Sequence, residues 1–141
     1  MSAAAPDPAY QALRQTAGPC VLFESTTPAG PLSRRCLLAR HPRALLLAHR
    51  DRAEIVTREG SRSLAGDPLA ALRTLLAEVP PARWPEEGGV AGALAYDFAR
   101  PGREGAPTPL LVALAVDRFL VSEDGRLAAS DGPAAAGEGP P

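Results

Sequence analysis

The chain has 141 residues, which is enough for one domain with a buried core. Its 15 basic and 16 acidic residues give a net charge of −1, so electrostatics offer no basis for binding nucleic acid or an anionic membrane. The sequence has no apolar run of roughly 18 residues and no basic, then apolar, leader at its N-terminus. We therefore expect no transmembrane helix, no signal peptide and a cytoplasmic location.

Two cysteines, Cys20 and Cys36, are present. A disulfide scaffold would need more, and a zinc site would need about four ligands at close spacing. We expect two free, buried thiols in a reducing cytosol, with a single disulfide bridge as the alternative. His41 and His49 stand apart from any nucleophile or metal-ligand pattern, so the sequence predicts no catalytic residue and no metal ligand.

The first half of the chain alternates short apolar runs with turn residues. Residues 1–7 are rich in alanine and proline and are expected to be disordered. A short helix is expected next, because Pro8 suits a first helical turn and Gly18-Pro19 would end it. Five strands are then predicted over residues 20–26, 34–40, 44–49, 53–58 and 62–64, the last as a short edge strand.

The clearest helix begins at Asp67-Pro68. Asp67 is a good N-cap and Pro68 suits the first helical position, while Pro80-Pro81 would stop the helix. Its large apolar residues recur at a spacing of three and four, which predicts one buried face. These residues are Leu69, Leu72, Leu75, Leu76 and Val79.

A glycine-rich apolar segment follows over residues 88–98. Gly88, Gly89 and Gly92 permit close backbone approach or positive φ, and glycine inside a strand pattern usually marks a bulge or a close neighbour. We expect a central strand over residues 90–98 that ends in the pair Tyr96-Asp97. The spacing of these glycines is not that of a nucleotide-binding loop.

The last apolar stretch covers residues 110–121 and predicts a strand with an irregularity near Asp117-Arg118. Glu123-Asp124-Gly125 has the chemistry of a hairpin turn, so residues 126–130 would pair back. Residues 131–141 are low in complexity and predict a tail or linker. These elements predict an α+β fold, with mostly antiparallel sheets and about two helices in a single domain over residues 8–130.

Five motifs in this order resemble one family. They are Leu22-Phe23-Glu24-Ser25, a basic residue at Arg35, the helix that opens with Asp67-Pro68-Leu69, the Gly-Gly-x-x-Gly-x-x-x-Tyr-Asp pattern of residues 88–97, and the strand over residues 116–121. The chain resembles the N-terminal domain of anthranilate synthase component I and of its relative aminodeoxychorismate synthase component I. The resemblance runs from about Pro8 to Ser130.

The resemblance implies a non-catalytic role in tryptophan or folate (4-aminobenzoate) biosynthesis. It implies that Glu24, Ser25 and Arg35 form part of a feedback site for an amino acid such as L-tryptophan. The chorismate and Mg²⁺ chemistry of the family lies in a C-terminal catalytic domain that follows this region, so we expect no cofactor and no activity in this chain alone. That catalytic domain, and a glutamine amidotransferase subunit, are the partners that the resemblance implies.

Each of these residues also has a simpler interpretation. Glu24 and Ser25 could be an exposed strand end with a local hydrogen bond, and Arg35 could form a surface ion pair. Gly88, Gly89, Gly92, Tyr96 and Asp97 could face the catalytic domain, or could serve packing within this domain. The sequence therefore leaves three hypotheses open: a regulatory or structural domain, a standalone binding or scaffold domain, and a small enzyme in its own right.

Overall fold

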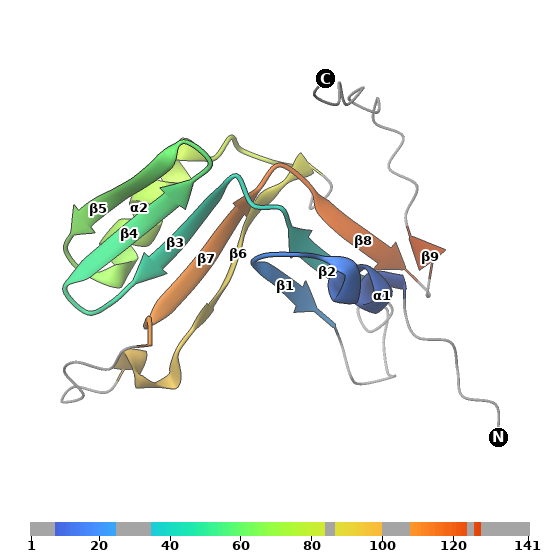
Figure 1. Cartoon of the computed structure of the whole chain (residues 1–141), viewed down its shortest axis with the longest axis horizontal. Coiled ribbons are helices and arrows are strands. Elements are labelled where there is room, and N and C mark those ends of the chain that lie inside the picture. Colours follow the sequence, from blue (N-terminus) through green and yellow to red (C-terminus); the bar gives the residue numbers. More distant parts are fainter. Residues whose placement is uncertain (1–7, 25–34, 84–86, 100–107, 124–125, 128–141) are drawn as a thin grey trace.

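The computed structural model describes residues 8–24, 35–83, 87–99, 108–123 and 126–127. Their fold is α+β, as predicted, with two α-helices and two antiparallel sheets (Figure 1). The elements are α1 (Pro8–Gln15), β1 (Cys20–Phe23), β2 (Arg35–Arg40), β3 (Ala44–Ala48), β4 (Arg52–Thr57), β5 (Gly60–Ala65), α2 (Pro68–Glu78), β6 (Gly89–Leu94), the 3₁₀ helix η3 (Tyr96–Ala99), β7 (Leu111–Val116), β8 (Phe119–Glu123) and β9 (Arg126–Leu127). The predicted disordered start and low-complexity tail lie outside the described residues.

The smaller sheet has the strand order β1-β2-β8-β9, and the larger has the order β5-β4-β3-β7-β6. The chain passes between them twice, from β2 to β3 and from β7 to β8, and the two sheets together form an arch (Figure 1). The first passage bends at His41, whose φ of 51° is left-handed. Just after it, the Arg43 backbone N–H donates to the Ala115 carbonyl at 2.9 Å, which holds the two passages together.

The irregularity predicted near Asp117-Arg118 is confirmed, and it is larger than expected. The apolar stretch is not one strand: β7 belongs to the larger sheet and β8 to the smaller one. Apolar composition alone could not reveal this break, because apolar residues continue on both sides of it, up to Val116 and again from Phe119 to Val121.

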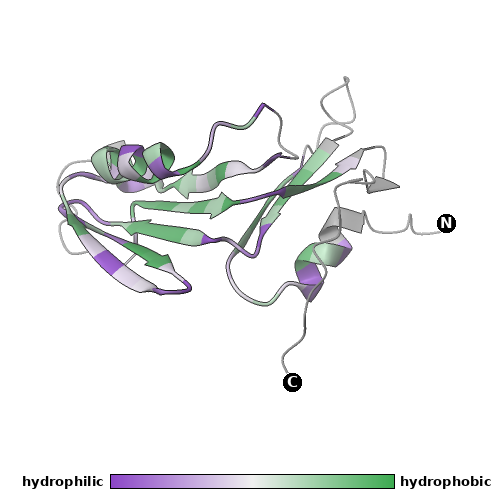
Figure 2. Cartoon of the chain, turned by 90° about the horizontal axis from the view of Figure 1, so that it is seen from above, coloured by the Kyte–Doolittle hydropathy of each residue, from purple (hydrophilic) through white to green (hydrophobic). Residues whose placement is uncertain are grey.

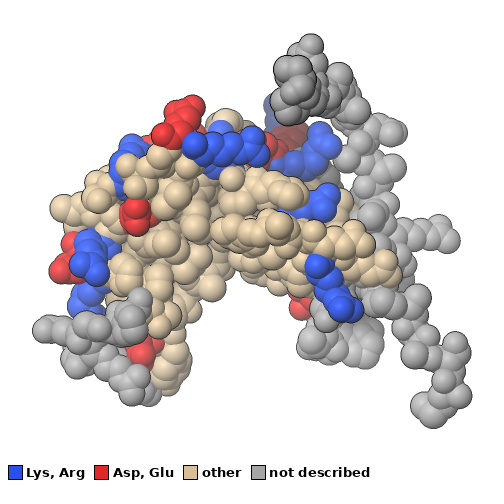
Figure 3. All heavy atoms as spheres, in the orientation of Figure 1, with Lys and Arg blue, Asp and Glu red and all other residues tan. Residues whose placement is uncertain are grey.

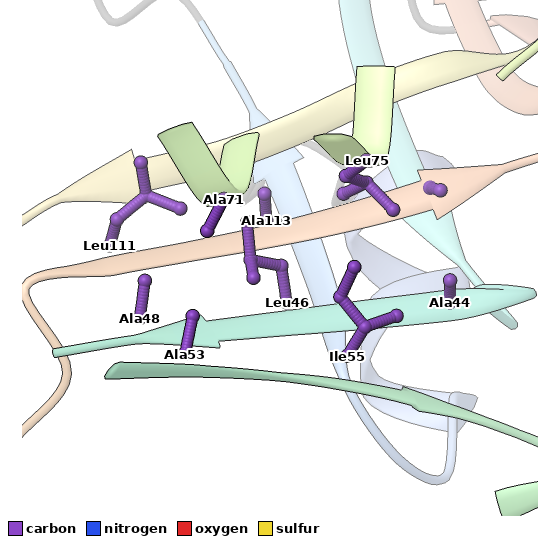
Figure 4. Packing of buried hydrophobic residues seen from close by; sticks show 10 residues of the cluster. Ala44, Leu46, Ala48, Ala53, Ile55, Ala71, Leu75, Leu111 and Ala113 are labelled. Carbon is purple, nitrogen blue, oxygen red and sulfur yellow. The ribbon is translucent and has the colours of Figure 1, made fainter. Parts of the chain in front are cut away.

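The main core lies between α2 and one face of the larger sheet. Figure 4 shows Ala71 and Leu75 of α2 over Leu46 and Ile55 of the strands. Leu46, Ile55 and Leu75 are each at most 1% exposed. Burial of such branched side chains contributes roughly 1.5–3 kcal/mol each, so this face anchors the domain.

The helix α2 begins as predicted, since the Asp67 carboxylate accepts from the backbone N–H groups of Leu69 and Ala70 at 2.8 and 3.0 Å. Its predicted buried face is only partly right. Leu75 is buried, and Leu72 and Val79 are partly buried against the core. Leu69 and Leu76, however, are 39% and 49% exposed. The buried stripe is instead centred on small Ala71 and on Leu75, because small residues let the helix approach the sheet closely.

The prediction of a central strand over residues 90–98 is wrong in position and in length. β6 lies at the edge of the larger sheet and ends at Leu94. Tyr96 and Asp97 belong to η3, not to a strand. A run of apolar residues usually predicts a buried, central strand. This run consists mainly of glycine and alanine, which expose little apolar surface to water, so it can also lie at the edge of a sheet.

A second, smaller core joins the two sheets. It contains Ala39 of β2, Ala91 of β6, Val116 of β7 and Phe119 of β8, with Val21 packed against it. Of these residues, Ala91 and Val116 lie on the face of the larger sheet that turns away from α2. The rest of that face is covered less completely, as the half-buried residues Leu45, Leu47 and Val112 show.

The two helices lie on opposite sides of the molecule, α2 against the larger sheet and α1 against the smaller one (Figure 2). The face turned away from α2 is the one seen in Figure 3, where charged side chains gather along the rim and one end while the middle is uncharged. Neither α1 nor α2 is long and apolar enough to cross a membrane.

Candidate functional site

A cleft of about 450 Å³ lies between the two sheets. Phe23, Leu37 and Phe119 line it from the smaller sheet, and Gly88, Gly89 and Gly92 line it from β6 and the residue before it. Ala82, Arg83, Val90 and Ala91 complete the lining. Aromatic and aliphatic side chains of the smaller sheet therefore face a glycine-rich segment of the larger one. This volume is within the range of small-molecule sites, and the lining suits a flat apolar group.

Packing within the domain requires glycine at two of these three positions. A Cβ on Gly88 would lie 2.5 Å from the Val116 carbonyl oxygen, and the φ of Gly88 is +97°. A Cβ on Gly92 would lie 2.2 Å from the Val112 carbonyl oxygen. Glycine is thus needed at both positions so that this segment can approach β7, whether or not another domain packs there.

Gly89 shapes the cleft itself. Its φ is +146°, and an added Cβ would lie 3.4 Å from Cε2 of Phe119. A side chain at position 89 would therefore project toward the Phe119 ring and narrow the space between the sheets.

Glu24 directly follows β1, and Arg35 begins β2. The register Phe23↔Leu37 places the end of β1 beside the start of β2, at the end of the smaller sheet that lines the cleft. The structure thus brings Glu24 and the backbone of Arg35 to the same end of one sheet. The Glu24 side chain is exposed, while Ser25 and the side chain of Arg35 lie outside what the structure describes.

Tyr96 and Asp97 lie at the other end of β6 from the glycines. At about 3.3 Å per strand residue, Gly89 and Tyr96 are separated by roughly 20 Å. The Tyr96 side chain is 79% exposed. The predicted site residues therefore divide into a group at the cleft and a pair at η3, and the sequence motif alone could not show this division.

A second pocket, of about 410 Å³, lies where the chain passes between the sheets and includes His41, Arg43, Arg58 and Asp117. Arg43 organises it: its guanidinium donates to the Glu78 carbonyl at 3.1 Å and lies 3.6 Å from Asp117 Oδ1. Arg43 thereby ties the C-terminus of α2 to the β7–β8 passage. The sequence does not single out Arg43 as a functional residue; the one signal near it is Pro42, which interrupts the apolar pattern between the strands over residues 34–40 and 44–49.

The described part of the chain contains no group of three or more His, Cys, Asp and Glu side chains placed to hold a metal ion. Cys20 and Cys36 form no disulfide, as predicted; Cys36 is buried, but Cys20 is only half-buried, contrary to the prediction. Neither pocket contains a nucleophile paired with a base among its described lining residues.

No model of a known protein family matches the chain, and no curated protein matches it.

Proposed function

We propose that this chain is the non-catalytic N-terminal domain of a chorismate-utilising synthase component I. One observation supports the proposal most: the cleft unites two of the motifs that carry the resemblance. Phe23, next to Glu24, forms one wall, and Gly88, Gly89 and Gly92 form the other. These segments are more than sixty residues apart in sequence, and they meet in a cleft of suitable size for a small molecule.

The ligand proposed for this cleft is L-tryptophan or a similar aromatic amino acid acting as a feedback effector. Phe23, Leu37 and Phe119 supply apolar surface for a planar side chain. Glu24 would accept the ligand ammonium group, while Ser25 and Arg35 would bind its carboxylate. The pathway would be tryptophan or 4-aminobenzoate biosynthesis in the cytoplasm.

The proposed partners are a chorismate-binding catalytic domain, which would hold Mg²⁺, and a glutamine amidotransferase subunit. The incompletely covered face of the larger sheet supports such packing. Leu45, Leu47 and Val112 remain apolar there, although one face of each strand is already buried against α2. A standalone binding or scaffold domain is the alternative, and it would be expected to carry polar residues at these positions.

The intact mass of the native gene product tests the domain proposal. We expect a product several times heavier than 14.6 kDa that consumes chorismate in the presence of Mg²⁺. A product of 14.6 kDa without chorismate activity would overturn the proposal in favour of the standalone domain.

Effector binding is tested separately by variants of that native product. Ser25→Leu should weaken tryptophan inhibition while sparing turnover, and Phe23→Ala should do the same from within the cleft. Glu59→Gln is the matched control, because Glu59 lies at the distant β4–β5 turn. If inhibition is unchanged in both cleft variants, the effector site is wrong even where chorismate turnover supports the domain proposal.

A further inference from the structure

β6 is an edge strand with no protecting charge. In the described part of the chain only β7 pairs with it. Between Glu87 and Asp97 there is no charged residue and no proline. Gly92, Ala93 and Leu94 are exposed, Leu94 by 57%. Natural sheets usually protect an edge with charges, proline or a bulge, since a bare edge pairs readily with another strand.

The opposite edge of the same sheet is protected. β5 carries Arg62, which forms an ion pair with Glu78 of α2. Ser61 and Ser63 on either side of Arg62 are exposed and polar. The two edges therefore differ in chemistry although they belong to one sheet, and only the β6 edge is suited to pairing.

The backbone of β6 has a defined set of groups facing outward. The Ala95 N–H donates to the Leu110 carbonyl at 2.8 Å, in register with Leu94↔Leu111. Hydrogen-bonded pairs alternate along an antiparallel ladder, so the backbone groups of Ala91 and Ala93 face β7. Those of Val90, Gly92 and Leu94 then face the free edge, where water or another strand must satisfy them.

We propose that β6 pairs with β6 of a second copy of this chain, antiparallel and across a twofold axis at Gly92. Gly92 then lies opposite itself, and Val90 lies opposite Leu94. No charged groups face each other within the paired strands, and the absence of a side chain at Gly92 lets the two copies approach closely. In such an isologous contact, the outward-facing backbone groups of both β6 strands form hydrogen bonds, and the two larger sheets join into one continuous sheet.

This proposal goes beyond the proposed function and does not depend on it, because it requires only the β6 edge that no other described strand pairs with. A second copy fits this edge better than a charged partner segment, which would place charges beside an apolar strand. The mass of the 141-residue chain in solution, measured by sedimentation or light scattering over a wide concentration range, tests it.

We expect a dimer of twice 14.6 kDa. Ala93→Lys and Leu94→Lys should each raise the dissociation constant by roughly tenfold or more, since a paired edge would have to accommodate a charge. Ser63→Lys, on the polar β5 edge, is the matched control and should leave the dissociation constant unchanged. A monomeric wild-type chain, or lysine variants of β6 that dimerise like wild type, would overturn the proposal.

Residue-level amide exchange shows which surface forms the dimer. In the wild-type dimer we expect slow exchange at Val90, Gly92 and Leu94, because their N–H groups would bond to the second copy. Exchange should also be slow at Ala91 and Ala93, whose N–H groups face β7. In Leu94→Lys the first three amides should exchange quickly while Ala91 stays protected, which would also show that the variant is folded. Fast exchange at Val90 and Gly92 in a wild-type dimer would place the interface elsewhere and refute the β6 pairing.

Discussion

At the scale of single residues, the arch depends on contacts that a small change would break. Gly88 and Gly92 lie against carbonyl groups of β7, where no side chain fits. Arg43 connects three parts of the chain at the passage between the sheets. Gly88 and Gly92 thereby set the position of the β6 wall of the cleft, and Arg43 fixes the passage between the sheets.

Gly92→Ala is expected to destabilise the protein by about 1–3 kcal/mol, because the added Cβ would lie 2.2 Å from the Val112 carbonyl oxygen and force the strands apart. Urea unfolding measures the loss in the free energy of unfolding. Ala93→Ser, at the neighbouring exposed position, is the control and should change that free energy by less than about 0.5 kcal/mol. Equal stability of the two variants would contradict the close approach of β6 to β7.

Arg43→Met is expected to cost about 1–2 kcal/mol. The loss comes mainly from the hydrogen bond to the Glu78 carbonyl at the end of α2, since the ion pair with the largely exposed Asp117 contributes little. Arg58→Met is the matched control, because Arg58 lines the same pocket and should change stability by less than about 0.5 kcal/mol. Thermal and urea unfolding of the two variants, compared side by side, decide whether Arg43 has this role.

At the scale of elements, the helix α2 shows how packing selects a face. Its sequence offers two overlapping apolar stripes, and the structure buries the one containing Ala71 and Leu75. Leu69 and Leu76 remain exposed at its flank. Spacing alone could not choose between the stripes, because the choice depends on how closely the helix approaches Leu46 and Ile55.

Leu75→Ala and Leu76→Ala form a matched pair that tests this orientation. Leu75 is 1% exposed, so its truncation should lower the free energy of unfolding by about 2–5 kcal/mol. Leu76 is 49% exposed, so the same truncation should cost about 1 kcal/mol or less. A reversed order of the two losses in urea unfolding would mean that α2 is rotated about its axis.

At the scale of the whole molecule, two sheets of unequal size share two continuous passages and one small core. Ala39, Ala91, Val116 and Phe119 make that core, and Phe119 also lines the cleft. The cleft therefore exists only while the sheets stay joined, so ligand binding there would be coupled to the stability of the joint.

Phe119→Ala is expected to destabilise both sheets together, by about 3 kcal/mol, because it removes the largest side chain of the shared core. Native-state amide exchange would show the same loss of protection at Leu38 in the smaller sheet and Leu46 in the larger sheet, both of which are fully buried. A loss confined to Leu38 would show that the two sheets unfold separately.

Sequence patterns by themselves determined much of the local structure. They predicted the α+β class, the start of α2 at Asp67, and the return of the chain at Arg126 to pair with the preceding strand. These features depend on turn chemistry, capping and alternation within a few residues, which the sequence records directly.

Only the tertiary structure decided how these elements combine. It divided the apolar stretch at Asp117 between two sheets, placed β6 at an edge and chose the buried face of α2. It also brought Phe23 to the glycines of the Gly-Gly-x-x-Gly pattern. It also left Tyr96 and Asp97 at the far end of β6. Each outcome depends on which apolar surfaces, far apart in the sequence, are buried against each other. The spacing of residues within a short segment does not determine which surfaces these are.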